Sequence, residues 1–158
     1  MKRITVAAVI GALITAVILC LIFCGKYDGM TLTVCNSETD DVIMEFPVKE
    51  GDEFSVEFIH SVNQSPVKDV FVIKGGKIFV DRTVYSAFGA GVQTEVEEGQ
   101  TLSYDENGNM VVSGFNIEFP RVKYIVGTVS DHILEICSEV ISLRDTCGRN
   151  AHIYFEMR

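Results

Sequence analysis

Residues 53–91 read EFSVEFIHSVNQSPVKDVFVIKGGKIFVDRTVYSAFGAG, and this stretch carries most of the information about the fold. Between Phe54 and His60, apolar and polar residues alternate, which is the pattern of a β-strand with one buried face. Gly75 and Gly76 then separate two strand-like runs, and such a pair favours the positive φ angles of a two-residue hairpin turn. The stretch therefore predicts antiparallel strands joined by short turns.

The same kind of pattern continues on both sides of this stretch. Strands are expected at residues 31–36, 42–48, 53–62, 67–74 and 77–85, and shorter ones at 100–104, 109–113, 132–137, 140–143 and 151–156. Strands that recur about every ten residues, separated by turn residues, are typical of an antiparallel sandwich or a small barrel. We therefore expect an all-β domain of one of these two kinds, preceded by one N-terminal transmembrane helix.

The amino-terminal segment differs from the rest of the chain. Residues 4–23 contain no charged side chain, and a helix of this length spans about 30 Å, the thickness of a bilayer core. Lys2 and Arg3 precede it, so the positive-inside tendency places the amino terminus in the cytoplasm and the remaining chain outside. We expect an anchor in the cell membrane over residues 1–25 and an extracytoplasmic domain over residues 26–158.

Two alternatives to an uncleaved, single-pass anchor are weaker. A cleaved secretory signal has a shorter apolar core and ends at small residues, whereas this run ends in Leu-Ile-Phe-Cys-Gly. Lipidation of Cys20 or Cys24 would require a small residue before the cysteine, but Leu19 and Phe23 stand there. The uncleaved anchor is therefore the preferred interpretation.

Charge and cysteine content argue against several classes of partner. The chain carries 13 basic and 22 acidic residues, a net charge of −9, which disfavours nucleic acid and a polybasic contact with anionic lipids. Cys35, Cys137 and Cys147 fall in the expected domain, and Cys137 and Cys147 could bridge neighbouring strands in an oxidising compartment. Their spacing is not that of a zinc site, so small buried thiols are the simpler interpretation.

The histidines do not form a recognisable catalytic or metal-binding motif. His60 and Ser61 are adjacent in a strand and point to opposite faces, so the imidazole cannot easily act as a base for that hydroxyl. The separations of His60, His132 and His152 match no metal motif, which favours structural hydrogen-bonding roles. Asp131 precedes His132 and could fix its tautomer.

The glycine run Gly89-Ala90-Gly91 is not a phosphate-binding loop. It lacks a following GK[ST] and a helix whose amino terminus could hold a phosphate. A packing corner at a sheet end is the preferred interpretation, with a nest of backbone amides for an anion as the alternative. We therefore expect no enzyme activity, no metal and no cofactor.

Three stretches together carry a resemblance to a known family. They are HSVNQSPVKDVF at residues 60–71, TVYSAFGAGVQT at residues 83–94 and VGTVSDHILEI at residues 126–136. In order and spacing they resemble the DUF1850 family of small membrane-anchored proteins of unknown function. That family has an HSV motif, an acidic residue after a PV pair, and a GAG motif.

The resemblance implies a set of site residues and a transport context. The matching residues are His60, Ser61, Val62, Pro66, Val67, Gly89, Ala90, Gly91 and His132. Asp69 stands where the family more often has Glu, and the shorter side chain would weaken a specific contact. Genes of the family are commonly found beside tripartite ATP-independent periplasmic (TRAP) transporters that use a TAXI-type solute receptor.

The resemblance therefore implies an accessory protein of a TRAP-type transporter, which contacts the permease or the TAXI solute receptor. The alternative is that the domain itself binds a small anionic or metal-containing ligand. That ligand would lie against His60, Ser61 and the glycine corner.

Overall fold

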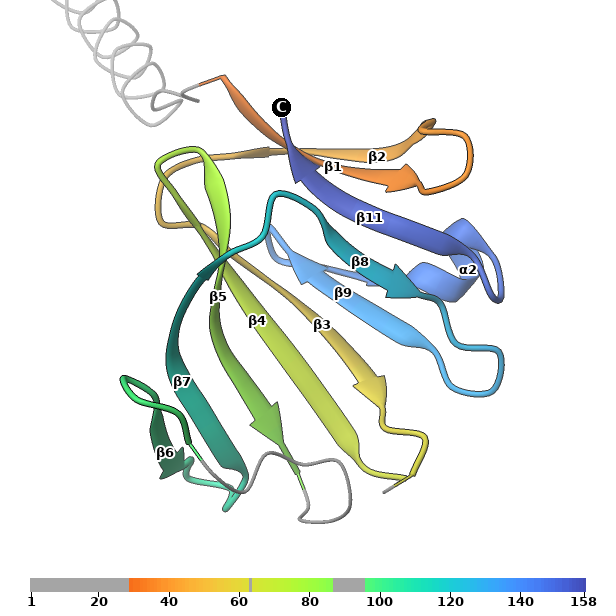
Figure 1. Cartoon of the computed structure of the whole chain (residues 1–158). Helices are drawn as coiled ribbons and strands as arrows, with labels where there is room; N and C mark the ends of the chain where they lie inside the picture. Colours follow the sequence, from red (N-terminus) through yellow and green to blue (C-terminus); the bar gives the residue numbers. More distant parts are fainter. Residues whose placement is uncertain (1–28, 63, 87–95) are drawn as a thin grey trace, which may run out of the picture.

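The computed structural model describes residues 29–62, 64–86 and 96–158 (Figure 1). The anchor expected over residues 1–25 lies outside the described residues. Within the described ranges, no helix has the length and apolar character needed to cross a membrane.

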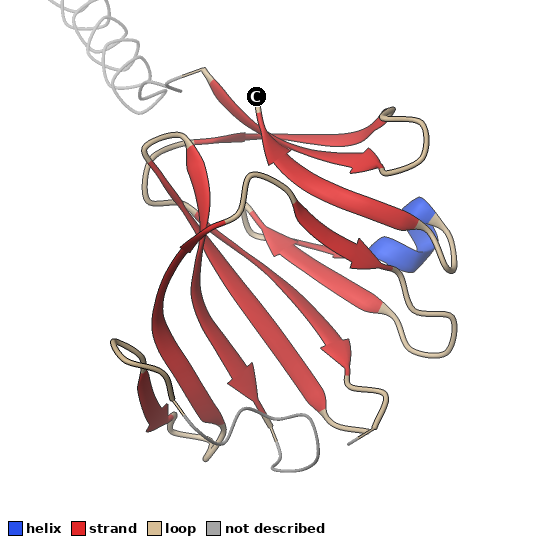
Figure 2. Ribbon diagram, viewed as in Figure 1, coloured by secondary structure: helices blue, strands red, loops and turns tan. Residues whose placement is uncertain are grey.

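Two antiparallel β-sheets face each other and form a sandwich (Figure 2). The small sheet has the order β2 (Val42–Val48), β1 (Met30–Asn36), β11 (His152–Met157), β8 (Val122–Ile125). The large sheet has the order β10 (Glu139–Ser142), β9 (His132–Ile136), β3 (Glu53–Ile59), β4 (Pro66–Lys74), β5 (Lys77–Tyr85), β7 (Met110–Glu118), β6 (Thr101–Tyr104). Of the two predicted arrangements, the sandwich is the one observed.

The hydrophobic core lies between the two sheets. The ring of Phe54 on β3 stacks on Phe71 of β4, with centroids 4.9 Å apart, and on Phe155 of β11, with centroids 5.3 Å apart. Phe54 and Val56 are both buried, as the alternation in the sequence predicts. Burying one such aromatic side chain contributes roughly 1.5–3 kcal/mol to folding. This aromatic stack therefore ties the large sheet to the small one.

The turn between β4 and β5 is the predicted glycine hairpin. Lys74 pairs with Lys77, and Gly75 and Gly76 between them have φ angles of 58° and 69°. Positive φ at both central residues defines a type I′ turn, which matches the right-handed twist of the flanking strands. The hairpin places β4 and β5 side by side and fixes which residues of each strand face the core.

The end of β3 differs from the prediction. A strand was expected to continue to residue 62, but β3 ends at Ile59 and His60 belongs to the following turn. The His60 N–H donates to the Ser65 carbonyl at 2.9 Å, and the His60 carbonyl accepts from Gln64 N–H at 2.9 Å. These bonds close the turn in place of the strand ladder.

Three further elements differ from the prediction. β7 was expected to end at residue 113, but it continues past Gly114 to Glu118 with an irregular register against β5. β8 was not predicted at all. The strand expected over 140–143 stops at Ser142, whose hydroxyl accepts from Asp145 N–H at 3.0 Å and so begins the short helix α2 (Leu143–Cys147).

Candidate functional site

The carboxylate of Asp69 on β4 lies in the space between the two sheets. Its Oδ1 accepts a hydrogen bond from Thr83 Oγ1 at 2.9 Å, and its Oδ2 accepts one from the Tyr124 hydroxyl at 2.8 Å. Thr83 stands directly opposite Asp69 on β5, whereas Tyr124 reaches it from β8 in the other sheet. No lysine or arginine of the described ranges forms an ion pair with Asp69. The carboxylate is therefore held by neutral donors alone.

The negative charge of Asp69 affects two neighbouring tyrosines. Burial and then the charge of Asp69 raise the pKa of Tyr124 well above the usual value for a phenol. Burial and the same charge also raise the pKa of Tyr85 on β5. Both phenols stay protonated at physiological pH, so Tyr124 remains a hydrogen-bond donor to Asp69.

Asp69 lines a pocket of about 530 Å³ that we call the inter-sheet pocket. Its walls come from β4, β5 and β7 of the large sheet, from β8 of the small sheet, and from the segment that joins β7 to β8. Most of the lining side chains are aromatic or aliphatic, and the set comprises Phe71, Val80, Thr83, Phe115, Ile117, Phe119, Arg121, Val122, Lys123 and Tyr124 beside Asp69. One carboxylate therefore faces a mostly apolar space.

His132 lies beside Tyr124 at the start of β9. Its ring stacks on Phe58 with centroids 5.2 Å apart and meets Tyr124 edge to face at 5.9 Å. Its Nδ1 accepts from Gly127 N–H at 3.1 Å, so a neutral ring carries its proton on Nε2. Burial lowers the pKa of His132, and the charge of Asp131 opposes this effect.

The expectation that Asp131 fixes the His132 tautomer is wrong. The Asp131 carboxylate accepts from the backbone N–H of His132 at 2.7 Å, and the Ser142 hydroxyl also donates to it. The tautomer is fixed by Gly127 instead, and that residue must be glycine. A Cβ there would collide with the carbonyl oxygen of Ser130.

His60 and Ser61 lie on the turn between β3 and β4, and Pro66 begins β4. His60 is half-buried, and its Nδ1 accepts from Val62 N–H at 3.3 Å. Ser61 is exposed, and its carbonyl accepts from Gln64 Nε2 at 2.6 Å. Pro66 is the first residue of β4 and is exposed. The bonds of His60 support the expected structural role of its imidazole.

The structure thus brings together two of the candidate residues, Asp69 and His132, through the ring of Tyr124. His60 and Ser61 lie on the neighbouring turn, and Pro66 is the first residue of β4. Gly89, Ala90 and Gly91, the expected glycine corner, lie outside the described residues.

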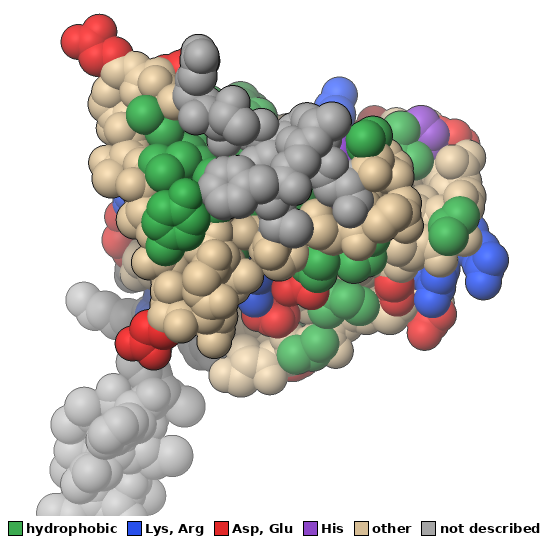
Figure 3. Space-filling view, turned by 90° about the horizontal axis from the view of Figure 1, so that it is seen from below, with side chains coloured by type: hydrophobic (Ala, Val, Ile, Leu, Met, Phe, Trp, Pro, Cys, Tyr) green, Lys and Arg blue, Asp and Glu red, His purple; other side chains and the backbone are tan. Residues whose placement is uncertain are grey.

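Two loops emerge from adjacent strands near these residues, because Phe58 of β3 pairs with His132 of β9. The turn after β3 carries Val62, whose side chain is 66% exposed, and the loop before β9 carries Val129, which is 92% exposed. We call these two loop tips the valine surface. Figure 3 views the molecule from below, and there hydrophobic side chains are interspersed with charged ones of both signs.

One family model matches most of the large sheet and the site residues. Residues 54–143 match the family model described as "Domain of unknown function (DUF1850)". The chain belongs to this family. The match includes the turn at His60, the strand with Asp69, and both Tyr124 and His132. No curated protein and no solved structure matches the chain.

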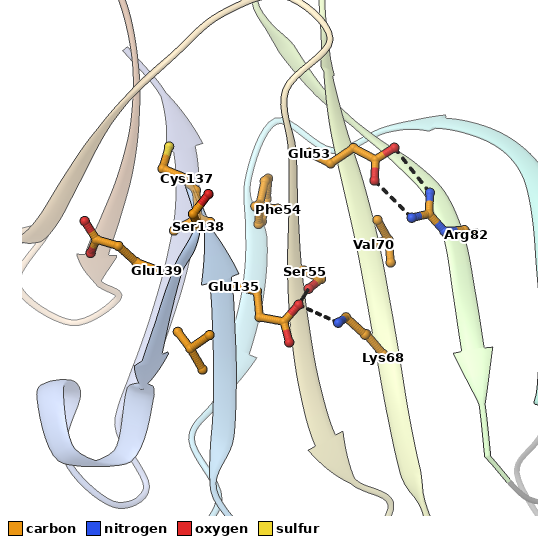
Figure 4. A pocket seen from close by; sticks show the side chains of 12 residues that line it. Glu53, Phe54, Ser55, Lys68, Val70, Arg82, Glu135, Cys137, Ser138 and Glu139 are labelled. Carbon is orange, nitrogen blue, oxygen red and sulfur yellow. Dashed lines mark hydrogen bonds and ion pairs between the residues drawn. The ribbon is translucent and has the colours of Figure 1, made fainter. Parts of the chain in front are cut away.

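The DUF1850 domain has a second pocket of about 310 Å³ on the outer face of its large sheet (Figure 4). We call it the outer pocket. Lys68 Nζ lies 2.5 Å from Glu135 Oε2, and Arg82 Nη2 lies 3.0 Å from Glu53 Oε2. Ser55 also donates to Glu135 at 3.5 Å. Each cation drawn in Figure 4 therefore already faces a carboxylate of the same protein.

The three cysteines in the described parts of the chain are free thiols, so the disulfide considered for Cys137 and Cys147 is not formed. Cys35 is buried as expected, but Cys137 is exposed at the turn between β9 and β10. Burial raises the pKa of Cys147, and burial with the charges of Asp52 and Glu139 raises that of Cys137. Neither thiol is therefore activated as a nucleophile.

No group of three or more histidine, cysteine, aspartate or glutamate side chains in the described parts of the chain is arranged to hold a metal ion. Sequence analysis did not identify Thr83 or Tyr124 as site residues. One signal was available. Asp69 alternates with Val67 and Phe71, which places a carboxylate on the buried face of β4, where it needs donors.

Proposed function

We propose that this protein is an accessory protein of a TRAP-type solute transporter and acts by protein contact. In this proposal residues 1–25 anchor it in the cell membrane, and the β domain lies outside the cytoplasm. Its partner is the permease or the TAXI-type solute receptor. The observation that carries the contact is the valine surface, and the transporter context comes from the sequence resemblance to the family.

The two valines are presented in a way that suits docking. Loops held on a rigid scaffold commonly carry binding contacts, and each of these two loops presents an exposed valine. Both loops are braced, because Val62 N–H donates to His60 Nδ1 and Gly127 N–H donates to His132 Nδ1. A braced loop loses less conformational entropy on binding than a free one.

Contact is better supported than catalysis by the hydrogen bonds around the candidate residues. The accepting nitrogen of His60 is occupied by Val62 N–H, and that of His132 by Gly127 N–H, so neither is presented to a serine hydroxyl as a base. Tethering at a membrane raises the effective concentration of a weak partner to roughly the millimolar range. A small contact surface is then sufficient.

The proposal is tested by solute uptake in a strain that lacks the gene. We expect reduced uptake through the transporter encoded beside it, and restoration by the wild-type gene. The double variant Val62→Ser and Val129→Ser should fail to restore uptake while keeping the wild-type melting temperature. Val140→Ser is the matched control. Val140 is 71% exposed on β10, outside the two loops that carry Val62 and Val129.

Co-purification then identifies the partner. The wild-type full chain should retain the permease or the receptor, and the double valine variant should lose it. Unchanged uptake in the deletion strain would refute the accessory role. Unchanged uptake and co-purification with the double variant would refute the valine surface.

The alternative of a small anionic or metal-containing ligand at His60 and Ser61 has less support. Neither residue is among those lining the two pockets described above. The part of that alternative that concerns the glycine corner lies outside the described residues.

A further inference from the structure

We infer that the inter-sheet pocket is a binding site for a small molecule that combines an apolar body with a protonated amine. The ammonium group pairs with the carboxylate of Asp69, and the apolar body fills the space between β7 and β8. This site is separate from the valine surface, so it goes beyond the proposed transporter contact and does not depend on it.

Asp69 carries a negative charge that no lysine or arginine of the described residues pairs with. A carboxylate has about four positions at which it can accept a hydrogen bond. Thr83 and Tyr124 occupy two of them, and neither donor carries a charge. A half-buried carboxylate that lacks a cation interacts strongly with any cation that enters the same low-dielectric space. The two remaining positions suit an ammonium group.

The inter-sheet pocket has the size and lining of a small-molecule site. Its volume of about 530 Å³ falls in the usual range of roughly 300–1,000 Å³ for small-molecule sites. Phe71, Phe115 and Val122 contribute apolar wall, and Ile117 and Phe119 are partly exposed. A mostly apolar wall with a small number of polar groups is the common composition of a ligand site.

Two cationic side chains, Arg121 and Lys123, also line the pocket. Arg121 donates from Nε to Glu156 at 3.0 Å, and its guanidinium lies 4.2 Å above the ring of Tyr154. The charge of Arg121 therefore interacts with Glu156 and Tyr154 and not with Asp69. Lys123 is exposed on the edge strand β8, where solvent screens it. Inside the pocket the uncompensated charge is therefore negative, which selects a cation and disfavours an anion.

The test uses isothermal titration calorimetry of the full chain with three probes of the same ring size. Benzylamine supplies an apolar ring and an ammonium, benzyl alcohol lacks the charge, and benzoate reverses it. We expect benzylamine to bind with millimolar or better affinity, and benzyl alcohol to bind at least about tenfold more weakly. Benzoate should not bind.

Asp69→Asn should lower the affinity for benzylamine at least about tenfold, because it removes the charge but keeps the shape. Asp41→Asn is the matched control, since Asp41 is exposed on the loop before β2. Backbone NMR shifts caused by benzylamine should map to Phe115, Val122 and Tyr124. If Asp69→Asn does not fold, Phe115→Trp fills part of the pocket and should produce the same loss.

Three results would overturn the inference. They are failure of benzylamine to bind, equal binding of benzylamine and benzyl alcohol, and benzylamine affinity that survives the pocket variants. Uptake by the deletion strain does not bear on any of these results, so the two proposals fail independently.

Discussion

The carboxylates on the two faces of the large sheet have different kinds of partner. On the outer face, Glu135 meets Lys68 and Glu53 meets Arg82. On the inner face, the carboxylate of Asp69 meets only the hydroxyls of Thr83 and Tyr124. Lys68 and Asp69 are neighbours in the chain, yet the strand pleat sends them to opposite faces. Lys68 therefore cannot compensate the charge of Asp69, although the two residues are adjacent in the sequence.

The ion pair on the outer face and the hydrogen bonds on the inner face are expected to contribute different free energies to folding. The side chains of Lys68 and Glu135 are 29% and 44% exposed, so solvent screens their attraction, and such pairs contribute only about 0–1 kcal/mol. Hydrogen bonds to a charged group that is partly buried contribute more, about 1.5–3 kcal/mol. The short ion pair is thus expected to stabilise the fold less than the longer hydroxyl contact.

Tyr124→Phe should produce the largest loss of stability. It removes the hydroxyl bonded to Asp69 but keeps the ring that contacts Phe58 and His132. We expect the free energy of unfolding to fall by about 1.5–3 kcal/mol, measured by urea denaturation. In the background of Asp69→Asn the same change should cost less, because no charged acceptor remains. A full-sized loss in both backgrounds would contradict this account.

Acidification should produce a smaller loss through His132. Its pKa in the folded protein lies below the unfolded value of about 6.5, because burial disfavours the charged ring. As pH falls below that value, the unfolded chain binds the proton first, so stability is present above it and declines toward the folded pKa. His132→Gln should flatten this dependence of unfolding free energy on pH.

Lys68→Met should have the smallest effect, about 0–1 kcal/mol in the same denaturation assay. The Met side chain keeps the apolar stem of lysine and removes only the charge that pairs with Glu135. High salt should reduce the difference further because it screens the wild-type pair. A loss as large as that of Tyr124→Phe would abolish the distinction between the two faces.

The strands that the sequence predicted best are those with clear alternation and strong turn signals. β2 and β5 have the expected limits, and the glycine hairpin before β5 has the expected turn type. β8, with 4 residues at an edge of the small sheet, was missed, although the equally short edge strands β6 and β10 were expected. The helix α2, with 5 residues, depends on the Ser142 cap and not on an apolar repeat.

The candidate site was predictable only in part. Asp69 and His132 came from motifs, and the apolar flanks of Asp69 indicated that it faces the core. Its partner Tyr124 lies 55 residues further along the chain and in the other sheet. Local patterns report which face a residue occupies, but they contain no information on what the opposite sheet places against it. The inter-sheet pocket could therefore not be found before the two sheets were seen together.

The position of β11 has a consequence for how the protein is made. β11 follows all the other strands in the chain, yet it lies between β1 and β8 in the small sheet. Leu32 of β1 pairs with Met157, and the ring of Phe54 stacks on that of Phe155, which is synthesised about 100 residues later. Contacts this distant in sequence form slowly, and incomplete sheets expose apolar strands.

During synthesis, β1 and β2 therefore emerge as a hairpin whose inner neighbour is still missing. A chain released before Ile153 would keep the large sheet's strands but could not close the small sheet over them. The small sheet is therefore expected to close late in folding, because β1 and Phe54 complete their contacts only when β11 is in place.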